Sequence, residues 1–189
     1  LARGDLTVAK GAVFAGLYWR PAHPLTVSLG ARLDVLSHNR TAEVSPRLSA
    51  AWAVSPRLTL KAAAGIFRQA VPTAILGITP AVRDNRNPAA AHFLFGVSHD
   101  VSKDFRWTLD VYDKQYRRLP VTPEDPEFSV FDLCLDYGVY RSFTTVTDDG
   151  QAAARGLEIT AEKKPGGTWH LFAGASLFRS RFRDALGRW

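Results

Sequence analysis

The sequence predicts an all-β fold, namely a segment of an antiparallel, up-and-down transmembrane β-barrel with about eight long strands, short periplasmic turns and long extracellular loops. Three observations favour this fold. Apolar and polar residues alternate along most of the chain, which is the period of a strand with one apolar face. The alternating stretches are about ten residues long, enough for a tilted strand to cross a bilayer, whereas ordinary strands average about five or six. The connections alternate between short and long.

The expected strands follow one another in order along the chain. The first, at residues 13–19, is less regular, whereas every odd position from Leu25 to Val35 is apolar and every even position is polar or glycine. The same alternation predicts strands at residues 44–54, 58–66, 93–101, 105–111, 157–161 and 169–177. Short turns are expected at 21–24, 55–57, 102–104 and 165–167, and longer links at 37–43, 68–91 and 118–154. Short turns at one rim and long loops at the other are typical of outer-membrane barrels.

Four tryptophans lie close to the short turns. Each is two or three residues from such a turn and shares the apolar face of its strand: Trp19, Trp52, Trp107 and Trp169. Indole prefers the membrane interface, with its ring in lipid and its N–H toward water. We therefore predict one aromatic girdle on the short-turn side.

The polar face of the strands is predicted to line the lumen. Its charged members are Arg32, Asp34, Arg47, Lys61, Asp110, Glu158 and Glu162. Asp113 and Arg179 are charged residues on the apolar face, where a charge at mid-depth is costly. We expect both at strand ends toward the longer links, beyond the apolar band.

Composition and motifs argue against several other functions. The net charge is +6, but the basic residues are scattered, which disfavours a nucleic-acid partner. Cys134 is the one cysteine, and the five histidines lack metal-ligand spacing, so neither a disulfide nor a metal site is expected. No catalytic constellation or cofactor motif is present, and no run of about 18 apolar residues predicts a transmembrane helix. We expect no enzyme and no cofactor.

The two longest links, 68–91 and 118–154, are the expected places for ligand contact, because loops of this length are uncommon unless they serve a function. Arginine suits carboxylate or phosphate groups, and aromatic rings suit planar or sugar-like groups. The candidate contact residues are Arg68, Gln69, Arg83, Asn85, Arg86, Asn87, Tyr137 and Tyr140. Ordinary loop packing is the alternative role for each of them.

Three stretches resemble consecutive hairpins in the barrel of TonB-dependent outer-membrane receptors. They are "SPRLSAAWAVSPRLTLKAAAGIFRQAVP", "NRNPAAAHFLFGVSHDVSKDFRWTLDVYDKQYRRLPV" and "ARGLEITAEKKPGGTWHLFAGASLFRSRFRD". The order of these patterns extends over most of residues 6–184. The resemblance implies that residues 1–189 are part of such a barrel, from its C-terminal half, without the plug domain or the final strand.

The resemblance also implies a function and a set of partners. The whole receptor would lie in the Gram-negative outer membrane, in contact with its lipid, and would bind and import a scarce nutrient such as a ferric siderophore, a cobalamin-like ligand or a carbohydrate. The plug domain and the remaining barrel strands would be partners, and the plug would connect the receptor to the TonB complex.

Two alternatives remain open from the sequence. Eight strands can close into a complete small outer-membrane barrel of structural or adhesion type, whose interior is filled by side chains. Alternating strands also suit a soluble β-sandwich that binds a carbohydrate or a protein.

Overall fold

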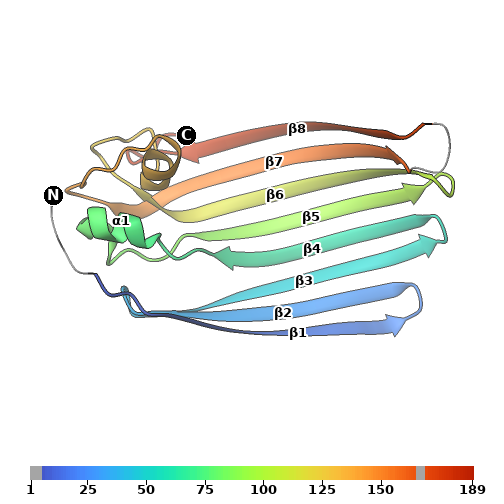
Figure 1. Ribbon diagram of the computed structural model, residues 1–189, viewed down its shortest axis with the longest axis horizontal. Helices are drawn as coiled ribbons and strands as arrows, with labels where there is room; N and C mark the ends of the chain where they lie inside the picture. The colour runs from blue at the N-terminus through green and yellow to red at the C-terminus, as the bar shows by residue number, and fades with distance from the viewer. Residues whose placement is uncertain (1–5, 165–168) are drawn as a thin grey trace.

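A computed structural model describes residues 6–164 and 169–189, and it confirms the all-β fold. Eight strands form one antiparallel sheet in which each strand pairs with its neighbours in the chain (Figure 1). They are β1 (Lys10–Ala22), β2 (Leu25–Leu36), β3 (Thr41–Ser55), β4 (Leu58–Arg68), β5 (Ala89–Asp100), β6 (Phe105–Val121), β7 (Thr147–Lys163) and β8 (Leu171–Arg183).

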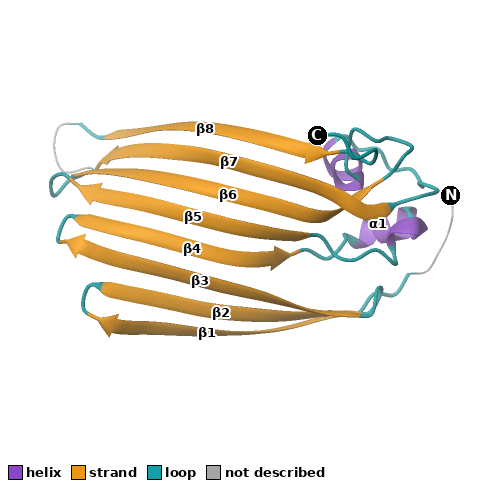
Figure 2. Cartoon of the chain, turned by 180° about the vertical axis from the view of Figure 1, so that it is seen from behind, coloured by secondary structure: helices purple, strands orange, loops and turns teal. Residues whose placement is uncertain are grey.

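The short and long connections lie at opposite ends of the sheet, as the sequence predicts (Figure 2). Links 23–24, 56–57 and 101–104 are at one end, and links 37–40, 69–88 and 122–146 are at the other. The expected turn at 165–167 lies outside the described residues. The link 69–88 contains α1 (Thr73–Ile78) and η1 (Pro80–Val82), and the link 122–146 contains the π-helical turn η2 (Asp132–Asp136).

The two long links are shorter than the predicted ranges 68–91 and 118–154. Strand β6 continues to Val121, β7 begins at Thr147 and β5 begins at Ala89. The added strand residues include alanines and charged side chains, so they hide the alternation. Their backbone hydrogen bonds to the neighbouring strand still extend the sheet. The alternation is absent there because a strand end that projects into water does not need an apolar face.

The buried apolar core lies at the long-link end and not in the sheet. We call the links 69–88 and 122–146 together the cap. Side chains from both links form one cluster, whose buried members are Val71, Ile75, Leu76, Val82, Val130, Leu133, Cys134, Phe143 and Val146. Burial raises the pKa of the Cys134 thiol, which keeps this side chain uncharged among apolar neighbours.

The sheet is open, with β1 and β8 as its two edges among the described residues. A closed eight-stranded barrel requires these two strands to pair, and a β-sandwich requires a second sheet. The described chain shows neither arrangement. Within that part of the chain, no helix is long and apolar enough to cross a membrane.

Candidate functional site

Strand register divides the sheet into two faces, because directly opposed residues in an antiparallel pair project to the same side. The polar face carries the charged residues that the sequence assigned to the lumen, from Arg32 on β2 to Glu162 on β7. Arg32 pairs with Asp34 at 2.8 Å, and the Arg47 guanidinium lies 4.7 Å from the centre of the Phe67 ring. Lys61, Asp110 and Glu158 belong to one row of this face, through Gly96. Their lumenal position remains a prediction.

Many large apolar side chains on the opposite, apolar face are exposed, and others such as Val97 and Leu109 are half-buried. Phe95 is 50% exposed, Val111 47% and Leu177 69%, although these are residues that soluble proteins bury. Exposed contiguous apolar surface of this extent is the mark of a membrane or protein contact.

The tryptophans follow an oblique line across the apolar face. Opposed residues form rows, two residues apart along each strand. Trp52 lies one row nearer the short turns than Trp19, and Trp107 lies two rows nearer. With about 3.3 Å per residue and about 4.8 Å between strands, this descent from β1 to β6 corresponds to a tilt of about 30°. Strands of membrane barrels tilt by about 35–45°, so these tryptophans share nearly one depth. The girdle itself stays a prediction.

Most of the predicted ligand-contact residues form hydrogen bonds within the chain. Asn87 is fully buried and donates to Glu43 Oε2 at 2.8 Å, and Arg68 donates to Glu43 Oε1 at 3.1 Å. Arg83 donates to the Leu76 carbonyl oxygen at 2.8 Å. The Asn87 contact joins the cap to the sheet, the Arg68 contact joins β4 to β3, and the Arg83 contact lies within the cap.

The other predicted contact residues divide between internal pairing and exposure. Arg86 forms an ion pair with Asp148 at 2.7 Å, and the Asn85 carbonyl oxygen accepts a hydrogen bond from Asn39 at 3.1 Å. Gln69 is exposed, as are Tyr137 and Tyr140, at 63% and 59%. The exposed three therefore remain the stronger candidates for ligand contact.

A groove of about 540 Å³ lies between the cap and the outer ends of β6, β7 and β8. Tyr137 lines it, and the Phe128 ring packs edge-on against the Tyr137 ring at 5.1 Å. We call this space the cap groove. Residues that the sequence did not single out also line it, including Tyr116, Phe182, Glu127, Asp132 and Asp136. They come from three separate segments, so spacing along the chain gives no signal of their proximity.

The charges on the apolar face are more numerous than the sequence suggested, and Asp113 is not at a strand end. It lies at the middle of β6, because β6 continues to Val121. Its carboxylate pairs with Arg155 on β7 at 2.6 Å, and Arg155 is directly opposed to Arg179 on β8. Arg155 was missed because the predicted strand began only at residue 157.

The residues that the structure describes contain no group of three or more potential metal-binding side chains. Taken together, the strands form a sheet with one apolar and one polar face, tilted relative to the line of the tryptophans, and the cap covers its long-link end. Such a sheet is a section of the wall of a transmembrane barrel.

A comparison with protein families identifies the family to which this barrel wall belongs. The family model described as TonB dependent receptor-like, beta-barrel matches residues 2–188. The chain belongs to this family of outer-membrane transporters, which are not enzymes. A comparison with curated proteins finds no match.

Several solved structures share the fold. The FrpB iron transporter from Neisseria meningitidis is 14% identical with a TM-score of 0.69, over 94% of this chain and 26% of that chain. The siderophore receptor PiuA from Acinetobacter baumannii is 13% identical with a TM-score of 0.70, over 94% and 26%. The outer-membrane transporter YddB from Escherichia coli is 11% identical with a TM-score of 0.71, over 95% and 25%. The chain thus spans about a quarter of the length of these proteins.

Proposed function

We propose that this chain forms part of the wall and part of the extracellular mouth of a receptor that imports a scarce nutrient of the ferric-siderophore class. The family assignment carries the transport role. The cap groove supports a ligand at the mouth, because it combines aromatic rings from the cap and the sheet with carboxylates from the cap. Rings of this kind stack on planar groups such as the aromatic donors of many iron chelators.

A plug domain inside the barrel is the partner that the polar face supports. Asp110 on β6 is directly opposed to Glu158 on β7, and like charges in such a pair destabilise a sheet. Lys61 lies in the same row on the other side of Gly96, and its positive charge partly compensates that of Asp110, the nearer carboxylate. A cationic side chain from a plug would balance the negative charge of Glu158. We propose that the plug then transmits energy from the TonB complex.

Ligand binding to the full-length receptor tests the nutrient class. Purified receptor is titrated with ferric siderophores, cobalamin and oligosaccharides, and the Tyr137→Ala variant is compared with wild type. We expect a ferric siderophore to bind, and Tyr137→Ala to weaken its binding about two- to tenfold, because one aromatic contact contributes about 0.5–1.5 kcal/mol.

Tyr18→Ala is the matched control, because Tyr18 is 61% exposed but lies near the short-turn end of β1. It should bind like wild type. Binding of cobalamin or an oligosaccharide in place of the siderophore would overturn the nutrient class. An unchanged affinity in Tyr137→Ala would remove the cap groove as the binding site.

A further inference from the structure

Arginines are concentrated on the apolar face at the outer ends of β6, β7 and β8. They are Arg117, Arg155, Arg179, Arg181 and Arg183. The first four are exposed. Among the residues that the structure describes, Arg117, Arg179 and Arg181 have no carboxylate partner.

The same face at the outer ends of β1 to β5 is different. Its residues there are uncharged and mostly small: Gly11, Val35, Ala42, Ala89 and Ala91. Arg68 is the exception, and its guanidinium binds Glu43. The arginines of β6 to β8 are therefore a local patch and not a ring around the sheet.

The register spreads this patch over four residue positions along the strands, because Arg117 and Arg183 share a row through Gln151 and Arg179 shares another with Arg155. Arg117 lies ten strand residues from Trp107, whereas Arg179 lies six residues from Ala173, which shares the row of Trp107. Ten strand residues extend about 33 Å along the strand, or about 25 Å of depth at a tilt of about 40°, which is the height of the apolar band. With the tryptophans at the headgroups of the inner leaflet, Arg117 lies at the headgroups of the outer leaflet, and the long side chains of Arg179 and Arg181 extend toward the same level.

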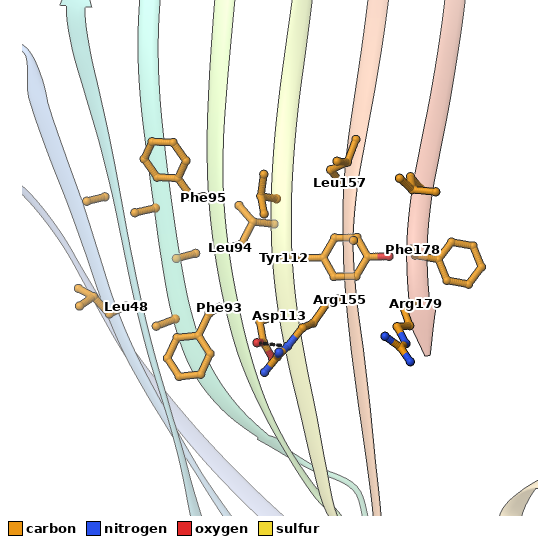
Figure 3. A pocket seen from close by; sticks show the side chains of 17 residues that line it. Leu48, Phe93, Leu94, Phe95, Tyr112, Asp113, Arg155, Leu157, Phe178 and Arg179 are labelled. Carbon is orange, nitrogen blue, oxygen red and sulfur yellow. Dashed lines mark ion pairs between the residues drawn. The ribbon is translucent and has the colours of Figure 1, made fainter. Parts of the chain in front are cut away.

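Arg155 lies in the same row as Arg179, and it is the exposed arginine of the patch that has an acidic partner. It is six residues from Ala161, which is opposed to Trp107. Its ion pair with Asp113 joins β6 and β7 at 2.6 Å (Figure 3). A charge within the apolar band is costly unless it is paired or its side chain is long enough to reach the headgroup level, where water and lipid phosphate solvate it.

An apolar groove of about 1150 Å³ adjoins the patch on the same face. Its floor includes Ala50, Ala62 and Ala64, and Phe93 and Phe95 rise beside it. Asp113, Arg155 and Arg179 lie side by side at one end, and Phe95 and Leu157 lie further toward the short turns (Figure 3). A groove that is apolar along its length and basic at its outer end matches an acyl chain with an anionic headgroup.

We propose that this surface binds a phosphorylated glycolipid of the outer leaflet, the lipid A class. Arg117, Arg179 and Arg181 contact its phosphates, and the groove holds one of its acyl chains. Arginine suits phosphate because its planar guanidinium donates two parallel hydrogen bonds. The site adjoins the cap groove, because Arg181 also lines that groove.

Lipid retention by the full-length receptor tests this proposal. The receptor is purified in detergent, and bound bisphosphorylated lipid A is counted by native mass spectrometry. We expect the variant R117Q/R179Q/R181Q to retain lipid A roughly 100-fold less tightly than wild type, since each basic residue near a membrane surface contributes about 1 kcal/mol. The control R20Q/R57Q/K103Q removes the same charge near the short turns and should retain it normally.

A second variant has an effect of opposite sign. Asp113→Asn frees Arg155 for a phosphate and should tighten lipid A retention about fivefold, a gain that misfolding does not produce. Equal retention by wild type and R117Q/R179Q/R181Q would overturn the proposal, as would equal loss in the short-turn control. Displacement of lipid A by inorganic phosphate, or retention of dephosphorylated lipid A, would also overturn it.

Discussion

Large apolar side chains are exposed on one face of the sheet but buried in the cap. On the apolar face of the sheet, Phe95 is 50% exposed and Leu177 69%, whereas in the cap Ile75 and Leu76 have no exposed area. The difference shows that one chain is adapted to two surroundings. Lipid covers the sheet, so its apolar side chains need no protein core. Water surrounds the cap, so its apolar side chains must cover one another.

The largest effect is expected from a charge placed in the middle of the apolar band. Phe95→Arg should prevent assembly of most of the receptor, because an arginine at mid-depth costs about 2–4 kcal/mol. The measurement is the fraction of receptor extracted from outer membranes that shifts on gels after heating. Ser176→Arg, on the polar face opposite Glu158, should assemble normally. Failure of Ser176→Arg alone would reverse the assignment of the two faces.

A cavity in the cap should leave the sheet intact. Ile75→Ala removes a fully buried side chain, which costs about 2–5 kcal/mol of stability. We expect faster hydrogen exchange throughout 69–88 and 122–146 and unchanged exchange in the strands. Leu135→Ala, at a cap residue that is 53% exposed, should change little. Faster exchange across the strands as well would mean that cap and sheet unfold as one unit.

Sequence reasoning reached the sheet more completely than the cap. Alternation from Leu25 to Val35 follows from one lipid-facing side, so all eight strands could be predicted. At 151–155 the alternation is lost among alanines, and the outer ends of the strands were therefore missed together with Arg155. The cap core joins Ile75 to Val130 and Phe143, which are far apart in the chain. Such contacts depend on how the two links pack against each other, and no local sequence pattern predicts that packing.

Most of the predicted ligand-contact residues show the same limit. Arginine and asparagine in a long loop suit a ligand and an internal hydrogen bond equally well. Asn87 is buried against Glu43, and Arg86 is paired with Asp148. The exposed Tyr137 lies in the cap groove. The residue types were informative, but burial decided which of them could contact a ligand.

An intermediate effect is expected at the junction between the two regions. Glu43 on β3 is 9% exposed and accepts hydrogen bonds from Arg68 and Asn87, while Arg118 lies 3.6 Å away. Glu43→Ala leaves these donors without their acceptor, at a cost of about 1–3 kcal/mol. Hydrogen exchange should quicken at the end of β4 and at residues 86–88, while the cap core stays protected.

Asp34→Ala is the control for this junction. Asp34 pairs with the more exposed Arg32, and exposed pairs contribute only about 0–1 kcal/mol. Its removal should leave exchange at the junction unchanged. An equal effect of Asp34→Ala and Glu43→Ala would show that the junction depends on the general charge of the polar face and not on Glu43.

The smallest effect is expected at the short-turn end, which belongs to neither apolar region. Asp104 accepts hydrogen bonds from Lys163 at 2.8 Å and from Ser102 at 2.7 Å, and these contacts, that with Lys163 above all, lower its pKa to about 2. An unfolded aspartate has a pKa of about 3.9. The contribution of Asp104 to stability is therefore complete above about pH 4 and is lost as the pH falls toward 2.

Asp104→Asn should remove this part of the acid dependence of unfolding in detergent. Lys163→Gln should remove most of the same part, and the double variant should add little. Additive effects of the two substitutions would show that Lys163 does not set the pKa of Asp104.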